Sequence, residues 1–475
     1  MSTLATEALS ETSSLVVGQT NQGVDVRATL LRFTRHLVIF EVYNPHLILR
    51  TSEVLTGFQI IIQNRPVYSG KAAISSLVNI GTVLVCEATL DESWIDPEIF
   101  SLAATPASLR GSYERFFQQW QSNYRILPEF KSLIADIQTF LTELRLWLEQ
   151  VELGVRAMPS GDRFKAEREI VQELADPIIF SLNFLFEKFE LITARIEGDL
   201  RPAHSIFAKR QLHPLLLCSP FMHRIYRKPL GYAGDYEMVN MILRDPHEGS
   251  SLFSKLLNYW FLRQAPAEAH RNRVRFLTQR IVEEALGARA RGGRLRVYNL
   301  GCGPAREVAD FLERYELADH SEFTLLDFNE ETIACAESVL NEARRKHHRV
   351  TPIHLIKKSV FQVLKSAGHV TGDQFDLIYC AGLFDYLQDR VCRQLTNMFY
   401  AMLAPGGLLL VTNVDFSNPI QGIMGYIFEW HLIYRNGKQL AEFAPNDASP
   451  DRCKVSADTT GGNIFLEVRK PEGLS

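Results

Sequence analysis

The sequence predicts a multidomain protein with three parts: an N-terminal small β-barrel, a central α-helical domain and a C-terminal α/β Rossmann-like sheet. The length of 475 residues allows two to four domains at about 100–200 residues each. The hydrophobic pattern also changes twice along the chain. Short β-rich segments come first, a helical period of three to four follows, and alternating strand and helix patterns begin at Arg294.

Composition and charge exclude several classes of protein. Lys and Arg total 51 against 55 Asp and Glu, a net charge of −4, which argues against bulk nucleic-acid binding and against a polybasic membrane anchor. The seven cysteines form no CxxC pair, so we expect no metal site and reduced thiols. No basic-then-apolar leader and no apolar run of ~20 residues is present, and we expect a cytoplasmic protein with no integral membrane segment.

Residues 1–15 are rich in Ser, Thr and Ala and are predicted to form a disordered tail. Residues 16–105 are predicted to form the barrel. Its apolar segments are short, rich in Val, Ile, Phe and Thr, and separated by Pro, Gly and Asn: VRATLLRF, HLVIFEVYN, VLTGFQIIIQN and TVLVCEATL.

Residues 106–285 are predicted to be the helical domain. Two apolar stripes at helical spacing run from Ile134 to Val151 and from Val171 to Ile192. Met158 to Asp162 forms a turn between them, and Pro177 is expected to kink the second helix. Such a hairpin either packs on its neighbours in a bundle or forms a homodimer contact.

Residues 286–475 alternate between apolar strands and helices, which predicts a doubly wound sheet. Five of these runs are expected to be parallel strands. A terminal hairpin with a Gly-Gly turn adds two more and makes seven. The five runs are LRVYNL, EFTLLDFN, PIHLIKKSV, FDLIYCAG and GLLLVTNV.

A glycine-rich turn follows the first of these strands. In Tyr298–Ala305, Gly301 and Gly303 permit a tight turn and close approach of a ligand, with Cys302 between them. Asp327 ends the next strand, where an acid can accept both hydroxyls of a ribose; alternatively it caps the helix that begins at Glu330. Phe328 and Asn329 are placed to border an adenine.

The runs NLGCGPA, LLDFN, FDLIYCAGLFDYL and LAPGGLLLVTNV together resemble class I S-adenosylmethionine-dependent methyltransferases. The resemblance covers Arg294 to the end and implies S-adenosyl-L-methionine as cofactor. A nicotinamide dinucleotide is the alternative, but the third glycine of its fingerprint is missing. The residues that the resemblance assigns to the cofactor are Gly301 and Gly303 for its methionine part, Asp327 for the ribose, Ser359 and Val360 for the adenine, and Ala381 and Gly382 beneath the sulfonium. Many relatives carry an acid where this chain has Lys358 and Ser359.

A second motif, Arg227–Met238, contains two aromatics, two acids and two glycines in one short loop. It is expected to cap the cofactor and substrate site, and four of its side chains are expected to face the transferred methyl group: Tyr232, Asp235, Tyr236 and Glu237. Alternatively, Asp235 is the N-cap of the following helix.

A third motif is Glu429–Arg435, in which His431 and Arg435 are four residues apart and are expected to share a helix face. His431 would act as a general base, and Arg435 would pair with an acceptor carboxylate. The alternative is an ordinary polar pair on an amphipathic helix. Asp385 and Tyr386 are further candidates for contact with the acceptor.

These motifs also resemble a narrower bacterial group, the extracellular-factor 3-hydroxypalmitic acid methyl ester biosynthesis proteins, from Leu212 to the end. That resemblance implies O-methylation of a fatty-acid carboxylate. The N-terminal segment resembles a degenerate PilZ barrel, in which Arg32 and Arg35 echo a basic motif for cyclic di-GMP, while only Ser75, Ser76, Asn79 and Gly81 stand near the place of its second motif.

Three functions therefore compete at this point. The first is a small-molecule methyltransferase in which Arg435 orients an acidic acceptor and Tyr232 and Tyr236 flank the methyl group. The second is transfer of the aminocarboxypropyl group from the same cofactor. The third is a non-catalytic protein that senses the cofactor and reports to a partner through the β-domain.

Overall fold

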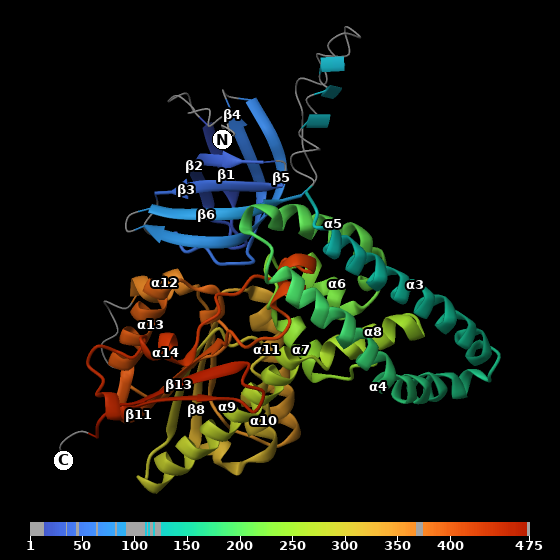
Figure 1. Ribbon diagram of the computed structural model, residues 1–475. Coiled ribbons are helices and arrows are strands. Elements are labelled where there is room, and N and C mark those ends of the chain that lie inside the picture. Colours follow the sequence, from blue (N-terminus) through green and yellow to red (C-terminus); the bar gives the residue numbers. More distant parts are fainter. Residues whose placement is uncertain are drawn as a thin grey trace. The chain divides into compact units, whose positions relative to one another are not determined.

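The computed structural model divides the chain into two compact units, residues 1–125 and residues 126–475 (Figure 1). The structure describes residues 14–34, 36–43, 47–62, 65–80, 83–91, 110–111, 113–114, 117–118, 125–366 and 374–472. None of the helices within these ranges combines the length and apolar character needed to span a bilayer.

The first unit contains a closed antiparallel barrel with strand order β1-β2-β3-β6-β5-β4, which confirms the predicted small β-barrel. Alternate residues point inward, as Val26, Ala28 and Leu30 do on β2. Two strands, β1 and β5, were not predicted, and β1 begins at Ser14, inside the stretch predicted as a tail. The strands are β1 (Ser14–Gln19), β2 (Asp25–Phe33), β3 (Leu37–Val42), β4 (Val54–Ile62), β5 (Arg65–Ile80) and β6 (Val83–Leu90).

The second unit begins with the predicted helical hairpin, α3 (Pro128–Arg156) and α4 (Ser160–Thr193). Most side chains of both apolar stripes are buried, and α4 continues as a helix on both sides of Pro177. Further helices follow: α5 (Arg201–Leu216), α6 (Pro220–Arg227), α7 (Tyr236–Leu243), α8 (Leu252–Leu262) and α9 (Ala265–Ala290), with a 3₁₀ turn at Gly198–Leu200 before α5.

A seven-stranded sheet with the order β12-β13-β11-β10-β7-β8-β9 forms the rest of this unit. The first five strands along the chain are parallel and the last two form an antiparallel hairpin, as predicted. The strands are β7 (Leu295–Leu300), β8 (Ser321–Asp327), β9 (Ile353–Lys357), β10 (Phe375–Cys380), β11 (Leu403–Val414), β12 (Cys453–Ala457) and β13 (Asn463–Arg469).

Helices cover both faces of this sheet (Figure 1). Side chains of α9, α10 and α11 share one core with alternate residues of the central strands, among them Val297, Leu325 and Leu377. Because Ile281 of α9 belongs to that core, the predicted boundary at 285/286 falls inside a helix that packs on the sheet. The remaining elements are α10 (Arg306–Arg314), α11 (Glu330–Lys346), α12 (Val360–Ser366), α13 (Asp389–Met402), α14 (Gly437–Ala441), a π-helical turn at Ile423–Ile427 and 3₁₀ turns at Glu316–His320, Phe384–Tyr386 and Pro450–Arg452.

The order of the parallel strands reverses between β7 and β10. In an open α/β sheet, ligands bind in the crevice outside the carboxyl ends of the strands at such a switch point. The glycine turn after β7 and the segment after β10 both lie at this edge. The residues that follow β7, β8 and β10 are therefore the candidates for ligand binding.

Candidate cofactor and acceptor site

The glycine turn joins β7 to α10 through backbone conformations that favour glycine. Gly301 and Gly303 have φ of 77° and 53°, and Ala305, with φ of 51°, leads into the helix. The amides of Gly301 and Cys302 donate to the Leu326 carbonyl at 2.8 and 3.0 Å, which ties the turn to β8. A Cβ added at Gly303 would meet no atom within 4 Å, so open space lies beside the turn. This arrangement is a cradle that a ligand can approach closely.

Asp327 ends β8 beside this cradle and is buried. Its Oδ2 accepts a hydrogen bond from the Gly303 amide at 3.2 Å and its Oδ1 accepts one from the Asn329 amide at 3.1 Å. The helix cap is Asn329 instead, whose side chain accepts from the Thr332 amide. The capping alternative for Asp327 is therefore wrong. A carboxylate has about four lone-pair positions, and the residues here fit the ribose of S-adenosylmethionine.

A buried network of polar side chains lies next to the glycine turn, and the sequence analysis did not identify it. The Glu307 carboxyl accepts from the Tyr379 hydroxyl at 2.7 Å and from the Asn299 amide at 3.3 Å. Burial raises the pKa of Glu307. Asn299 and Tyr379 are paired across β7 and β10, so this network links the start of α10 to both strands at the switch point.

The loop of the second motif lies against residues that follow two different strands. The ring of Tyr232 packs on the ring of Phe328, which follows β8, with centroids 5.3 Å apart. Gly234 lies against Tyr386, which follows β10, because an added Cβ would come 2.5 Å from the Tyr386 hydroxyl. That hydroxyl also accepts from the Trp430 indole at 2.9 Å. The second and third motifs thus meet at the carboxyl edge of the sheet.

Asp235 has a structural role in this loop. It caps α7 by accepting from the Met238 amide at 2.8 Å, and Arg224 donates to both of its oxygens at 2.9 and 2.8 Å. Asp235 is buried, so its carboxylate is directed into these contacts and not toward a ligand. Tyr236 opens α7, and burial is the main reason that its pKa is raised. Its phenol therefore stays protonated at neutral pH.

The segment after β11 is not the helix that the spacing of His431 and Arg435 predicted. A π-helical turn ends at Ile427, and residues 428–436 are not helical. Glu429 has a φ of 50° and pairs with Lys209 of α5, while the Lys228 ammonium donates to the Phe428 carbonyl at 3.1 Å. These contacts turn the chain back toward α5 and α6 and prevent a regular helix.

Arg435 is buried and cannot pair with an acceptor as predicted. Nε and Nη2 donate to Asp389 at 3.1 and 2.7 Å, and Nη2 also donates to the Leu387 carbonyl at 2.7 Å. Nη1 donates to the Phe384 carbonyl at 2.8 Å and to Asn413 at 2.7 Å. Because a guanidinium has only five N–H donors, these bonds use its whole capacity. The role assigned to Arg435 is corrected to structural support of the segment after β10.

Burial lowers the pKa of His431 to about 4, which makes it a weak base at neutral pH. His431 lies near Gly425 of the π-helical turn, since an added Cβ there would come 3.7 Å from its ring. Asp385 is also buried, with its pKa raised by burial, and accepts from the Val414 amide at 2.6 Å. The low pKa makes His431 a poor base, and the Asp385 carboxyl is directed at the backbone of β11.

The remaining predicted cofactor residues lie at the same edge. Ala381 and Gly382 follow β10, and the Gly382 amide donates to Thr412 of β11 at 3.0 Å. Ser359 follows β9 and caps α12 by accepting from the Gln362 amide at 3.3 Å, with Val360 as the first residue of that helix. Their contacts with a cofactor stay predictions.

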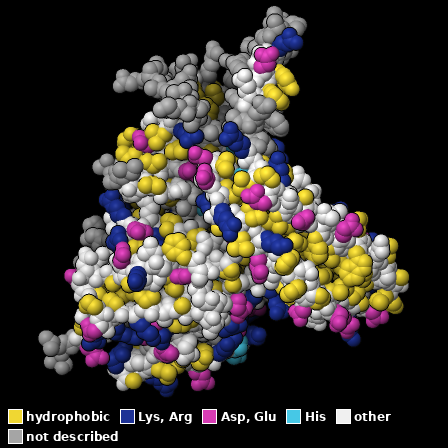
Figure 2. All heavy atoms as spheres, viewed as in Figure 1, with side chains coloured by type: hydrophobic (Ala, Val, Ile, Leu, Met, Phe, Trp, Pro, Cys, Tyr) yellow, Lys and Arg dark blue, Asp and Glu magenta, His cyan; other side chains and the backbone are white. Residues whose placement is uncertain are grey.

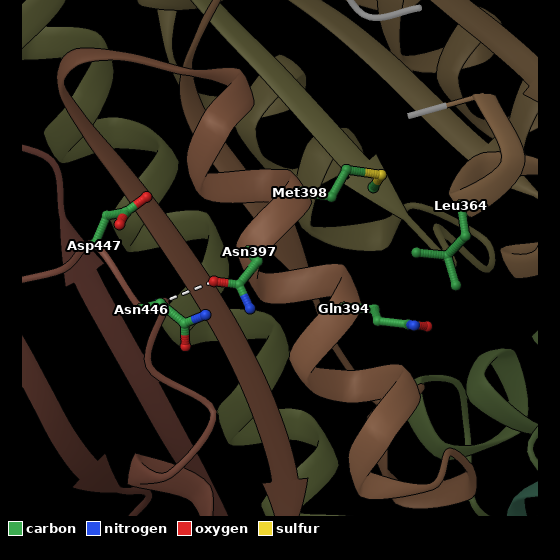
Figure 3. A pocket seen from close by; sticks show the side chains of 6 residues that line it. All are labelled: Leu364, Gln394, Asn397, Met398, Asn446 and Asp447. Atoms are coloured by element: carbon green, nitrogen blue, oxygen red, sulfur yellow. Dashed lines mark hydrogen bonds between the residues drawn. The ribbon is translucent and has the colours of Figure 1, made fainter. Parts of the chain in front are cut away.

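A surface depression elsewhere on this unit has a different character (Figure 3). Asn397 accepts there from the Asn446 amide at 2.9 Å. Asn397 and Met398 lie in the last two turns of α13, which leads to the amino end of β11, so the depression is away from the carboxyl edge. It is lined by Leu364, Gln394, Asn397, Met398, Asn446 and Asp447.

Comparison with known proteins gives a family match for the region that contains the cradle. Residues 298–409 match the model of a methyltransferase domain. No curated protein matches the chain. Among solved structures, a protein from Bordetella parapertussis described as a possible exported protein is 17% identical over 66% of this chain and 100% of its own, with a TM-score of 0.42.

Two further solved structures are methyltransferases with bound S-adenosylhomocysteine. N-methyltransferase NodS from Bradyrhizobium japonicum WM9 is 17% identical over 50% of this chain and 98% of its own, with a TM-score of 0.30. Magnesium protoporphyrin IX methyltransferase from Synechocystis PCC 6803 is 12% identical over 56% and 99%, with a TM-score of 0.34. At these scores the matches carry no argument about substrate. The second unit therefore contains a segment similar to a methyltransferase domain, and the glycine turn and Asp327 both lie within the matched residues.

Proposed function

We propose that this protein transfers the methyl group of S-adenosylmethionine to the carboxylate of a small molecule, such as a hydroxy fatty acid, and forms a methyl ester. The observation that carries the proposal is the state of the candidate bases. Asp235 is held by Arg224 and a helix amide, and burial lowers the pKa of His431 to about 4. An acceptor that is already ionised fits such a site better than one that must lose a proton.

The chemistry requires little acid or base from the protein. The sulfonium of the cofactor supplies an electrophilic methyl group for in-line displacement. A free carboxylate has a pKa of about 4 and is ionised at neutral pH, whereas an amine or an alcohol needs a base. The chain then has to orient the two reactants and exclude water.

The loop of Tyr232 and Gly234 supports the exclusion of water. It lies against Phe328 and Tyr386, and Trp430 bonds to the same Tyr386 hydroxyl. These aromatic side chains come from three separate parts of the sequence and meet at the carboxyl edge of the sheet. Such a surface fits an acceptor with an apolar chain, which favours a fatty acid among carboxylates.

We assign cofactor contacts to the residues around the cradle. In this proposal Gly301, Cys302 and Gly303 approach the methionine part, and Asp327 accepts the ribose hydroxyls. Tyr232 and Tyr236 lie beside the methyl group. The adenine is bordered by Phe328, Asn329, Ser359 and Val360, and Ala381 and Gly382 lie beneath the sulfonium.

The test uses S-adenosylmethionine with an isotope-labelled methyl group, the purified protein and a series of free and hydroxylated fatty acids. Mass spectrometry follows both the label and the cofactor product. Label in a methyl ester together with S-adenosylhomocysteine supports the proposal. Release of methylthioadenosine would instead indicate aminocarboxypropyl transfer. Cofactor binding without turnover on every acceptor would favour a sensor, and the D327A variant serves as the blank.

We propose in addition that the barrel is an accessory PilZ-type domain that acts as a scaffold. Arg32 is exposed on β2, while Arg35 and Gly81 lie outside the described residues. Ser75, Ser76 and Asn79 lie within the long strand β5, and Ser75 donates to Glu87 at 2.9 Å. Calorimetry with cyclic di-GMP tests this idea: binding that R32A abolishes would make the barrel a nucleotide sensor.

The helical hairpin is proposed to mediate a homodimer. Hydrophobic side chains gather over this part of the molecule in Figure 2, and Phe180, Phe184 and Leu191 of α4 are exposed by 76%, 54% and 62%. They lie along one face of the helix. Light scattering should give a dimer for the native chain and a monomer for the F180E/F184E variant; a native monomer would contradict this proposal.

A further inference from the structure

Arg273 of α9 reaches the carboxyl edge of the sheet, although no sequence motif includes it. A Cβ added at Gly382 would lie 2.9 Å from both Nη1 and Nη2 of Arg273. Gly382 has a φ of 80°, and the following residue, Leu383, lies beside the glycine turn, 3.6 Å from a Cβ added at Gly301. The guanidinium is therefore next to the crevice between β7 and β10.

Within the described part of the chain, this guanidinium forms no ion pair with a carboxylate, and its hydrogen-bond partner is His270. Nη2 donates to His270 Nδ1 at 2.8 Å, which requires a neutral imidazole. By contrast, Arg224 and Arg435 of the same unit are each paired with an aspartate. A part-buried guanidinium with unused donors favours an anion that comes from outside the chain.

The nearby acids face Arg273 only at longer range, and both are engaged by other donors. Asp385 accepts from the Val414 amide at 2.6 Å, and Glu307 accepts from the Tyr379 hydroxyl at 2.7 Å. Burial raises the pKa of both carboxyl groups. The positive charge at the end of β10 is thus incompletely compensated by the protein itself.

We propose that Arg273 binds the carboxylate of the methionine part of S-adenosylmethionine. Asp327 ends β8 on one side of β7, and Gly382 follows β10 on the other side. In this cofactor the ribose and the carboxylate are at opposite ends of the methionyl chain. A ligand with its ribose at Asp327 that crosses the glycine turn therefore has its carboxylate near Arg273. A planar guanidinium can bind a carboxylate through two parallel hydrogen bonds.

This proposal explains the glycine at position 382, because a side chain there would strike the guanidinium. It rests on the cofactor site proposed above. The acceptor is the other source of a carboxylate in this reaction, and its carboxylate could bind the same guanidinium. The experiment must therefore separate the cofactor carboxylate from the acceptor carboxylate.

The test measures dissociation constants by calorimetry for S-adenosylmethionine and for decarboxylated S-adenosylmethionine, which lacks only this group. The native protein should bind the complete cofactor about 10- to 100-fold more tightly. R273M should lose about the same factor for the complete cofactor and nothing for the decarboxylated one. R273K should retain part of the affinity. R275M is the matched control, because Arg275 lies on the same helix with its side chain 67% exposed and should leave both constants unchanged.

Three results would overturn the proposal. Equal weakening of both ligands by R273M would indicate a structural role. Unchanged cofactor binding with a raised KM for the acceptor would assign Arg273 to the acceptor carboxylate. If R273M fails to fold, equal affinity of the native protein for the two ligands would be decisive against it. A native protein that binds neither ligand would contradict the cofactor site itself.

Discussion

At the scale of the residue, three aspartates near the carboxyl edge of the sheet look alike in sequence and have different environments. Asp235 is bound by Arg224 and caps a helix, Asp385 is buried against a strand amide, and Asp327 accepts from the glycine turn. Of the three, Asp327 is the one that lies beside the cradle and accepts from an amide of the glycine turn. The role of each carboxylate therefore depends on the hydrogen-bond partners that the fold places around it.

Asp327→Asn is expected to weaken the binding of S-adenosylmethionine by about 10- to 100-fold, because a charged acceptor for two hydroxyls is lost. Calorimetry with the cofactor measures this. The matched control is Glu330→Gln, since Glu330 is three residues away with its side chain 82% exposed and paired with Lys357. Equal affinity in the Asn variant and the native protein would remove Asp327 from the ribose site.

Arg435→Met is expected to destabilise the protein by about 3–5 kcal/mol, because it leaves the acceptors of a buried guanidinium without donors. Urea unfolding measures the change. The exposed Arg393 of α13, with its side chain 47% exposed, gives the control R393M, which should cost under about 1 kcal/mol. A stable R435M protein with a raised acceptor KM would return Arg435 to the acceptor site.

At the scale of the element, the loop before α7 is held by contacts with three separate segments. Tyr232 packs on Phe328, Gly234 lies on Tyr386, and Lys228 bonds to the Phe428 carbonyl. This loop is neither strand nor helix, so its position depends on these contacts and not on a backbone ladder. Small changes in them should alter the site without unfolding the domain.

Gly234→Ala is expected to lower kcat/KM by about 10-fold or more, because the new methyl group would lie 2.5 Å from the Tyr386 hydroxyl and displace the loop. The double variant G234A/Y386F removes that oxygen and should recover part of the rate. Steady-state kinetics and a thermal melt of both variants distinguish this effect from unfolding. A fully active single variant would show that the loop does not cover the site.

His213 of α5 links this helix to the π-helical turn, and it predicts a pH dependence. Its Nε2 bonds to the Ile427 carbonyl at 2.8 Å, and burial lowers its pKa from 6.5 to about 4. Below pH 6.5 the unfolded chain therefore binds a proton that the folded chain does not. Stability due to this group is present above pH 6.5 and is lost as the pH falls toward 4.

The H213Q variant should lose this part of the pH dependence. The difference in unfolding free energy between native protein and variant should change by about 3 kcal/mol between pH 7 and pH 4, as measured by urea titrations. Subtracting the variant's free energy of unfolding from that of the native protein cancels the contributions of other titrating groups. One of these is Glu190, whose pKa is raised to about 7 by burial and whose effect on the pH dependence of stability has the opposite sign. Parallel stability curves for the two proteins would exclude His213 as the source.

At the scale of the whole molecule, the helices before the sheet belong to the same compact unit as the sheet. Leu277, Ile281 and Ala285 of α9 share a core with Val297 and Leu377. A chain cut at the predicted boundary of 285/286 would expose that core. A cut after residue 125 would leave this core intact, because all of its residues lie in the second unit.

A truncated protein of residues 126–475 is therefore expected to fold and to bind S-adenosylmethionine within about threefold of the full chain. Residues 286–475 alone should aggregate, because α9 buries several large apolar side chains at about 1.5–3 kcal/mol each. Circular dichroism, gel filtration and calorimetry compare the two truncations. A folded, cofactor-binding 286–475 fragment would contradict this division of the chain.

The sequence by itself determined the features that depend on local pattern. Hydrophobic period identified the helical hairpin, apolar runs identified the five parallel strands, and a Gly-Gly turn identified the terminal β-hairpin. The glycines that follow the first of these strands marked the turn after β7. Each of these elements is formed by one short segment of the chain, so the sequence of that segment is enough to predict it. The position of Asp327 beside the turn follows as well, because adjacent parallel strands end at one edge.

Only the tertiary structure decided which charged groups find partners inside the protein. Arg435 meets Asp389 and three other acceptors, while Arg273 arrives beside Gly382 from a helix that precedes the sheet. Local spacing predicted a helix for His431 and Arg435, but that segment is not helical. Its Glu429 pairs with Lys209 of α5, and Lys228 donates to its Phe428 carbonyl. The physical reason is that a charge's role depends on its neighbours in space, and those neighbours lie tens to hundreds of residues away along the chain.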